Sequence, residues 1–271
     1  MPKPAVYIIE QGGLGEPEPN ANLGEGAYSV GTTVGLITYE TGGTKRLMLV
    51  DSGLAASFEK IKTGFLNHGN LEDVTHILMT HFDQDHPQNN SKFPGAMIVS
   101  AVGTARSGTF TFGNTESLYP DNYIEDENIR FVNVSKTHSR DEMYYLVHSQ
   151  NQGLCLFAGD LMFASVEELP AEFSIEFDKR VTLDIVKKYK VLKGIYTDYP
   201  QLDAIFLSHS PNTMTRAGLK EYLQMLEQEP YVSFMEEFIE DLKQKASDYE
   251  GILGIIRNKG FKNGKGHGAG H

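Results

Sequence analysis

The sequence predicts an α+β protein built as a four-layer αββα sandwich, in which two mixed β-sheets pack face to face and helices lie outside. The main observation is the order of the apolar segments, which run as strands, helix, strands, helix, strand and helices. A doubly wound parallel sheet would instead alternate strands and helices regularly. In addition, 40% of the 271 residues are hydrophobic and 10% are aromatic, which is enough apolar material for a full core.

The N-terminal part is expected to form strands, because its apolar segments are rich in Val, Ile, Tyr and Thr and are separated by Gly-rich turns. A helix is expected over residues 54–67, where Leu54, Phe58, Ile61 and Phe65 are spaced by four, three and four residues. Residues 104–126 contain Gly, Ser, Asn and Pro throughout and predict a long loop with little strand content. The expected strands cover residues 5–9, 28–39, 46–50, 76–80, 96–101, 129–134, 143–148, 154–158 and 204–207.

The C-terminal part is expected to be mainly helical, with helices over residues 181–192, 215–227 and 232–245. We expect one domain over residues 1–259. Residues 260–271 alternate Gly with Lys, Asn and His and are too polar to offset the entropy of ordering, so a disordered tail is expected there.

Charge and cysteine content exclude several classes of protein. The chain has 24 Lys and Arg against 36 Asp and Glu, and a net charge of −12 argues against a nucleic-acid binder with a broad basic face. A nuclease with a local groove is still compatible. The one cysteine, Cys155, cannot form an intramolecular disulfide and is expected to be a buried apolar residue. Neither a signal peptide nor a membrane span is found in the sequence, so a cytoplasmic location is expected.

The segment Thr80-His-Phe-Asp-Gln-Asp-His86 carries the strongest functional signal. It follows an apolar strand and places two histidines and two aspartates within six residues. Such a loop can also be a solvated turn, and a lone histidine after a strand is usually structural. Three further groups follow other predicted strands, however, and imidazole with carboxylate is the ligand set of divalent first-row metals. The candidate metal ligands are His81, Asp83, Asp85, His86, His138, Asp160 and His209.

These residues resemble the metal signature of the metallo-β-lactamase fold superfamily. His81, His138, Asp160 and His209 are separated by 57, 22 and 49 residues, and the first motif of the family is usually written His-x-His-x-Asp-His. Residues 49–53 (Leu-Val-Asp-Ser-Gly) and 157–160 (Phe-Ala-Gly-Asp) are similar to two further motifs of the family. The resemblance covers roughly residues 5–211. Within the superfamily, the chain looks most like the small animal metallo-β-lactamase-domain-containing type 1 proteins.

The resemblance implies a site for two divalent ions. One ion would be held by His81, Asp83 and His138. The other would be held by Asp85, His86 and His209, and Asp160 would bridge the two ions. Asp83 stands where the family usually has a second histidine, and with a hydroxide the three carboxylates balance the four positive charges of the ions. Zinc is the metal that the fold implies first, whereas the extra carboxylate favours iron or manganese.

The function that this resemblance implies is a metal-dependent hydrolase, whose bridging hydroxide attacks an ester, thioester or phosphodiester. Asp85 is the expected catalytic residue, which would orient the hydroxide and take its proton. Two alternatives stay open: a di-iron enzyme that handles oxygen, and a non-catalytic metal-binding protein. The expected substrate is a small molecule or RNA. No membrane partner is expected, and a homodimer is a further expectation.

Overall fold

The computed structural model describes residues 3–17, 28–106, 109–112, 115, 119, 121–124, 126–134, 137, 139, 141–162, 182–228 and 244. The chain divides into two compact units, Met1–Gln224 and Met225–His271. Because only residues 225–228 and 244 of the second unit are described, the fold below is that of the first unit. The prediction of one domain through residue 259 therefore stays a prediction. Among the described residues, none of the helices has the length and apolar character that a membrane crossing requires.

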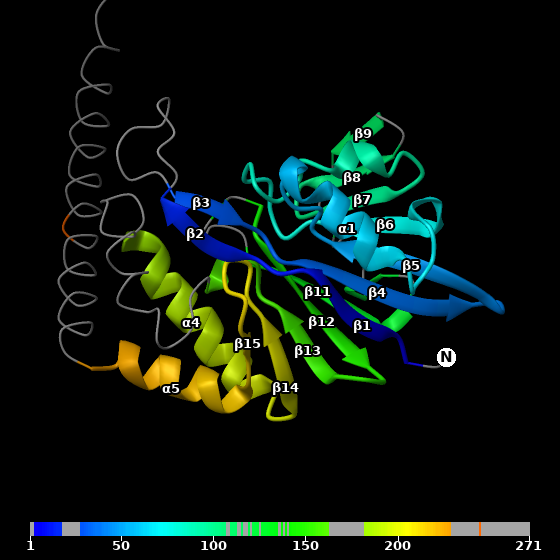
Figure 1. Ribbon diagram of the computed structural model, residues 1–271. Coiled ribbons are helices and arrows are strands. Elements are labelled where there is room, and N and C mark those ends of the chain that lie inside the picture. The colour runs from blue at the N-terminus through cyan, green and yellow to red at the C-terminus, as the bar shows by residue number, and fades with distance from the viewer. Residues whose placement is uncertain are drawn as a thin grey trace, which may run out of the picture. The chain divides into compact units, whose positions relative to one another are not determined.

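The first sheet has seven strands in the order β1-β4-β5-β6-β7-β8-β9 (Figure 1). The pairs β5–β6 and β6–β7 are parallel and the other neighbours are antiparallel, so the sheet is mixed. Its strands are β1 (Ala5–Glu10), β4 (Val34–Thr41), β5 (Thr44–Val50), β6 (Val74–Leu78), β7 (Met97–Ser100), β8 (Gly103–Arg106) and β9 (Thr109–Phe112).

The second sheet has six strands in the order β10-β11-β12-β13-β14-β15 and is also mixed, because only β13 and β14 are parallel. Its strands are β10 (Tyr123–Ile124), β11 (Asp126–Asn133), β12 (Met143–Ser149), β13 (Gly153–Phe157), β14 (Leu202–Phe206) and β15 (Thr213–Met214). A small third sheet pairs β2 (Gly13–Pro17) with β3 (Tyr28–Gly31).

Alternating side chains of the two large sheets build the core. On β4, Ile37 and Tyr39 belong to the apolar cluster between the sheets, whereas Leu36 belongs to the cluster under the first helix. On β12, Met143, Tyr145 and Val147 likewise enter the cluster between the sheets. Because side chains on a strand alternate between the two faces, each sheet has a second face that a helix can cover.

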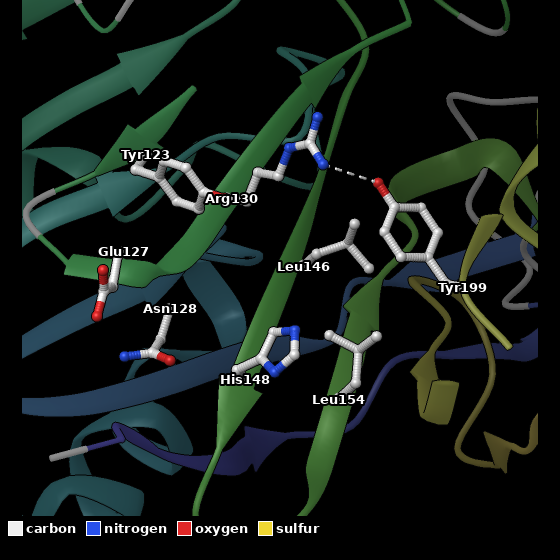
Figure 2. A pocket seen from close by; sticks show the side chains of 8 residues that line it. All are labelled: Tyr123, Glu127, Asn128, Arg130, Leu146, His148, Leu154 and Tyr199. Atoms are coloured by element: carbon white, nitrogen blue, oxygen red, sulfur yellow. Dashed lines mark hydrogen bonds between the residues drawn. The ribbon is translucent and has the colours of Figure 1, made fainter. Parts of the chain in front are cut away.

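Helices lie on the outer faces of both sheets (Figure 1). Helix α1 (Phe58–Phe65) buries Ile61 and Phe65 against the first sheet, and α4 (Thr182–Asp198) and α5 (Arg216–Leu226) lie beside the second. A cleft is found on the outer face of the second sheet, next to the C-terminal end of α4 (Figure 2). Four 3₁₀ turns complete the described elements: η1 (Ala55–Ser57), η2 (Leu71–Asp73), η3 (Asn90–Lys92) and η4 (Gly159–Leu161). The predicted αββα class is therefore confirmed.

Three sequence-based expectations about individual elements were wrong. Residues 28–39 form two strands in different sheets, because the chain crosses between the sheets at Thr32 and Thr33. The loop expected over residues 104–126 contains β9, β10, most of β8 and the first residue of β11. The Thr-Phe-Thr-Phe sequence of β9 suits an edge strand. The helix expected over residues 54–67 starts with a 3₁₀ turn and is α-helical only over Phe58–Phe65. The expected helix over residues 232–245 and the tail over residues 260–271 lie outside the described residues, residue 244 excepted.

Candidate metal centre

The loop that follows β6 brings the first group of candidate ligands to the edge of the sandwich. Two hydrogen bonds from β12 fix the start of this loop: the Tyr145 hydroxyl donates to the Met79 carbonyl at 2.7 Å, and the Met143 N–H donates to the Thr80 carbonyl at 2.8 Å. His81 and His86 are fully buried in this loop, whereas Asp83 is exposed. The strand end therefore places two imidazoles inside the protein at a point where the chain has no more sheet partners.

The turn between β5 and η1 holds the other end of the loop. The N–H groups of Ser52 and Gly53 donate to the His86 carbonyl at 2.9 and 2.8 Å. The buried Asn89 amide donates to the carbonyls of Ser52 and Leu54 at 2.9 and 2.7 Å. Gly53 has a φ of +70°, and a Cβ there would lie 2.9 Å from Val34 Cγ2, so glycine is required at this position. The site is thus built on rigid backbone rather than on a free loop.

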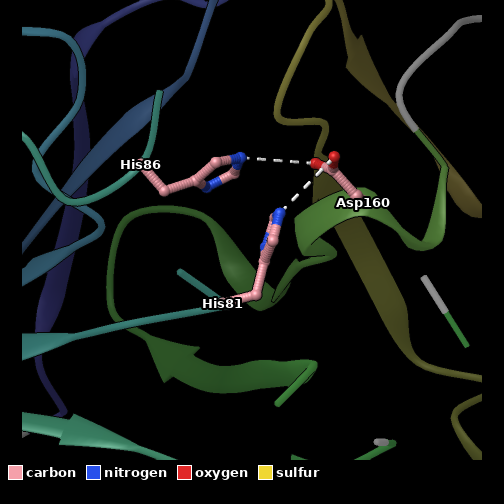
Figure 3. Close-up of side chains that lie close together, drawn as sticks. All are labelled: His81, His86 and Asp160. Atoms are coloured by element: carbon pink, nitrogen blue, oxygen red, sulfur yellow. Dashed lines mark ion pairs between the residues drawn. The ribbon is translucent and has the colours of Figure 1, made fainter. Parts of the chain in front are cut away.

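Three histidines from two separate segments converge on Asp160. His81 Nε2 lies 3.6 Å from Asp160 Oδ2, and His86 Nε2 lies 3.6 Å from Asp160 Oδ1 (Figure 3). His209, which follows β14, places its Nε2 3.2 Å from both oxygens of Asp160. The ring centroids of His81 and His86 are 3.9 Å apart. Two groups of side chains each offer ligand atoms within 4.8 Å of one another: His81, His86 and Asp160, and Asp85, His86 and His209.

Asp85 lies between two of these histidines. Its Oδ2 is 3.5 Å from His86 Nε2 and 3.7 Å from His209 Nε2. The Thr32 hydroxyl, from the crossing between β3 and β4, donates a hydrogen bond to the same oxygen. The carboxylate is therefore held in place by a neutral donor while it faces the histidines.

The structure brings Asp83 to the site, whereas His138 is not among the described residues. Asp83 Oδ2 lies 3.6 Å from His81 Nε2, so the residue at the unusual position of the motif is brought to the site. Its side chain is 53% exposed, which leaves it freer to move than the buried ligands. His138 lies outside the described residues, and its place in the site stays a prediction.

Asp51 and Thr80 determine which nitrogen of each buried histidine faces the centre. Asp51 Oδ2 accepts hydrogen bonds from the Thr80 hydroxyl at 2.7 Å and from His86 Nδ1 at 2.9 Å. Because the Thr80 hydroxyl has only one hydrogen and a carboxylate accepts it, the bond of 3.1 Å between Thr80 Oγ1 and His81 Nδ1 must be donated by the histidine. Both histidines therefore carry hydrogen on Nδ1, so Nε2 is the nitrogen of each ring that faces inward and is left for a metal.

Asp51 itself has a φ of 56°, which is uncommon for a residue other than glycine. Its backbone N–H donates to the Leu78 carbonyl at 3.0 Å, and its Oδ1 accepts the Thr80 N–H at 2.8 Å. The side chain is thus fixed at both oxygens. Strained backbone of this kind persists where the surrounding structure determines it and is common at functional sites.

Glu142 is a second buried carboxyl group behind the ligands. It is fully buried, its Oε1 accepts the Asp160 N–H at 3.0 Å, and the same oxygen is 4.0 Å from His81 Nδ1. Gly159, with a φ of +57°, makes room for it, because a Cβ there would lie 2.6 Å from Glu142 Oε1. Glu142 therefore positions the peptide of Asp160 and adds negative charge beside His81.

The charges at the site shift the ionisation of its members in a consistent direction. Burial alone would lower the pKa of His86, but Asp51, Asp160 and Asp85 together raise this pKa to about 10. The pKa of His209 is raised in the same way, since Asp160 and Asp85 outweigh its burial. Burial would raise the pKa of Asp160, but His209, His81 and His86 hold it well below the usual range. The site therefore attracts positive charge.

These features fit a divalent metal. His86 Nε2 is a buried nitrogen without a hydrogen-bond partner among the described residues, and it faces Asp160 and Asp85. A buried polar atom without a partner is costly, and a metal ion would satisfy it. Imidazole nitrogens with carboxylate oxygens are also the donors that zinc, iron and manganese take in proteins.

Sequence reasoning missed Thr32 and Glu142, and it named Asp51 and Thr80 only as parts of motifs. Thr32 is separated from Asp85 by 53 residues, and nothing local marks it. Glu142 stands just before β12, where an acidic residue is ordinarily a solvated strand end. The Asp at position 51, between an apolar strand and a glycine, was the signal that could have identified an outer carboxylate.

Comparison with solved structures agrees with this architecture. A protein from Thermotoga maritima named for the metallo-β-lactamases matches with 17% identity and a TM-score of 0.55, over 79% of this chain and 99% of that chain. The chain has the metallo-β-lactamase fold. At this identity the likeness establishes the fold alone.

Two other matches have lower scores. A quorum-quenching N-acyl homoserine lactone lactonase matches with 18% identity and a TM-score of 0.49, over 77% of this chain and 93% of that chain. A B3 metallo-β-lactamase with an active-site glutamic acid matches with 13% identity and a TM-score of 0.46, over 87% of this chain and 91% of that chain. No protein-family model matches the chain, and no curated protein matches it by sequence.

Proposed function

We propose that the chain is a metal-dependent hydrolase with a dinuclear centre. The observation that carries this proposal is the convergence of His81, His86 and His209 on Asp160, with Nδ1 of each imidazole held by protein groups and Nε2 turned inward. Here the Nε2 atoms lie 3.2–3.6 Å from carboxylate oxygens, which is about the separation of two donor atoms that bind one tetrahedral metal ion.

The proposed ligand sets follow the motif. His81, Asp83 and His138 would hold one ion, and Asp85, His86 and His209 would hold the other, with Asp160 touching both. The two oxygens of Asp160 support this division, because Oδ2 is the one nearest to His81 and Oδ1 is the one nearest to His86. The third member of the first set, His138, lies outside the described residues and comes from the motif alone.

Residues of the chain would accept the proton of the attacking water and hold the metal ligands in position. A pair of divalent ions bound there would make hydroxide available near neutral pH and polarise the acceptor oxygen of the substrate. Asp85, fixed by the Thr32 hydroxyl, would accept the proton of the attacking water, since its Oδ2 faces the gap between His86 and His209. Asp51, Thr80 and Glu142 would keep the histidines and Asp160 in one geometry, so that little reorganisation is needed.

Ester, thioester and phosphodiester bonds are the proposed substrates. The narrower resemblance to the small animal type 1 proteins would favour a nuclease, but the net charge of −12 repels a polyanion such as RNA. A small uncharged or singly charged substrate is therefore the better match. Cytoplasmic location and a homodimer also remain proposals.

A di-iron enzyme that handles oxygen is the second candidate, and one observation favours it. Asp83 lies 3.6 Å from His81 Nε2, so the first metal would gain a carboxylate where the family usually has a histidine. A ligand set that includes a carboxylate suits iron and manganese better than a set made only of histidines. A site that binds metal without catalysis is the third candidate.

Metal analysis of protein purified without a His-tag separates the three candidates. Two zinc ions per chain support the hydrolase, iron supports the oxygen-handling enzyme, and sub-stoichiometric metal supports a non-catalytic protein. Protein reconstituted with zinc, manganese or iron is then assayed on phosphodiester, lactone and thioester substrates. Hydrolysis should disappear in Asp85→Ala and persist in the matched control Asp121→Ala, since Asp121 is an exposed turn residue. Hydrolysis at the parental rate by Asp85→Ala would remove Asp85 from the mechanism, and oxygen consumption by the iron form without any hydrolysis would favour the second candidate.

A further inference from the structure

A cleft of about 330 Å³ on the outer face of the second sheet is separate from the metal centre. Leu146 and Leu154 form its apolar floor, and Arg130, His148 and Tyr199 stand around it (Figure 2). The strand β12 connects the two places, because it starts next to Glu142 at the metal centre and reaches His148 near its other end. Six residues of extended strand span about 20 Å, so a ligand in the cleft would not touch the metal ligands.

Strand register puts the polar groups of the cleft on one face. Arg130 pairs with Leu146, and His148 pairs with Leu154. Residues two positions apart on a strand share a face, so Asn128 lies on the same side as Arg130. Both leucines are buried, whereas His148 is exposed and Arg130 is half-buried. The cleft therefore combines an apolar floor with a small number of polar groups, as small-molecule sites do.

Arg130 is the cation that the described residues place in this cleft, and Glu127 is the carboxylate that lines it. Arg130 Nη1 donates to the Tyr199 hydroxyl at 3.2 Å, and within the described part of the chain no carboxylate lies within ion-pair distance of it. The guanidinium is always protonated and has five N–H donors, so most of them are left for water or a ligand. The chain has 36 acidic and 24 basic residues, so a half-buried arginine that has no acidic partner among the described residues is unusual for this protein.

We propose that this cleft binds a small monocarboxylate with an apolar body. The planar carboxylate would pair with the planar guanidinium of Arg130, and the body would lie on Leu146 and Leu154. Asn128 and His148 would add hydrogen bonds at the rim. A multiply charged phosphate fits less well, because Glu127 also lines the cleft and Arg130 is the single Lys or Arg among its described lining residues.

The test uses the full-length chain labelled with ¹⁵N. Benzoate and hexanoate are titrated as probes, and benzamide, which lacks the charge, is the matched neutral probe. We expect saturable shifts of the Arg130 Nε–H signal and of the signals around His148 and Leu154 with the carboxylates and none with benzamide. Shifts confined to the signals of His86 and His209, or equal shifts with benzamide, would overturn the proposal.

Variants separate ligand binding from the structural bond between Arg130 and Tyr199. Arg130→Gln should weaken carboxylate binding at least tenfold, since it removes a charge-assisted pair. Tyr199→Phe removes the structural bond but keeps the charge, and it should bind within about threefold of the parent. Arg46→Gln changes the net charge equally at an exposed site and should bind like the parent. Equal losses in Arg130→Gln and Tyr199→Phe, or parental binding by Arg130→Gln, would contradict the role of Arg130.

Discussion

Thr80→Val should weaken metal binding although Thr80 is not a proposed ligand. The side chain is 1% exposed, and valine has nearly the same shape, so the substitution removes hydrogen bonds without leaving a cavity. The hydroxyl donates to Asp51 at 2.7 Å and accepts from His81 at 3.1 Å. Loss of both bonds leaves a buried carboxylate short of a donor and an imidazole N–H short of an acceptor, and it should cost about 2–4 kcal/mol of folding free energy.

The same substitution should lower the affinity for zinc by about 10–100-fold, the usual effect of losing a group that orients a metal ligand. His81 would no longer be held as the Nδ1–H tautomer, so a fraction of the molecules would present hydrogen on Nε2 instead of a lone pair. The tautomer can be read from the ¹⁵N shifts of the two ring nitrogens of His81 in the metal-free protein. Affinity is measured by competition with a chelator of known strength.

Two matched variants control this experiment. Thr80→Ser keeps the hydroxyl and should restore the tautomer and most of the affinity, at a cost of about 1 kcal/mol for the lost methyl group. Thr75→Val, on β6, removes a hydroxyl that donates to the Leu47 carbonyl of the neighbouring strand β5, and it should reduce stability without changing zinc affinity. Zinc affinity of Thr80→Val within about threefold of the parent, with an unchanged His81 tautomer, would refute the assignment of hydrogen atoms given above.

Three other substitutions test the site and the core. Asp160→Ala should lose both metals, because its two oxygens face different histidines, and metal content by elemental analysis would show retention of one ion if the bridging role is wrong. Asp83→His should keep metal and shift the preference toward zinc, whereas iron binding equal to that of the parent in a competition assay would contradict the account of this position. Burial and, to a smaller extent, the charge of Asp203 raise the pKa of Cys155 from 9.0 to about 11. A hydrogen bond with Ser149 lowers this pKa but does not outweigh burial. The unfolded chain therefore loses this proton first, so stability should fall as the pH rises from 9 to 11, and Cys155→Val should reduce this fall in denaturant titrations at both pH values.

Much of the fold could be predicted because local patterns and the global arrangement agree. The strands of the two large sheets carry Val, Ile, Leu and Tyr in the alternation that a two-sided core needs. The crossing at Thr32 and Thr33 was missed, since both residues favour strands and the break depends on distant partners. Thr33 Oγ1 donates to the Leu207 carbonyl, which is 174 residues away in the sequence. Such a contact is determined by tertiary structure and leaves no local signal.

The candidate ligands were easier to predict than the residues that hold them. Ligands cluster in a short motif because a strand end can present several side chains to one point. Their supports come from any segment that passes nearby, as Glu142 shows: it reaches Asp160 only because the Met143 N–H binds the Thr80 carbonyl and brings β12 to the loop. The spacing of a motif therefore reveals the centre, and only the packed sheets reveal what surrounds it.

The balance of charge explains why folding and metal binding should be coupled in this protein. Asp51, Asp160 and Glu142 are at most 5% exposed, and buried carboxyl groups are costly without positive charge nearby. In the metal-free protein His86 and His209 supply that charge as protons: the pKa of both is raised, that of His86 to about 10, and the pKa of Asp160 is lowered. A metal ion must displace these protons to reach the nitrogen lone pairs, so its affinity should increase with pH up to about the pKa of His86. The carboxyl groups that orient the ligands thus also set the number of positive charges that the centre accepts.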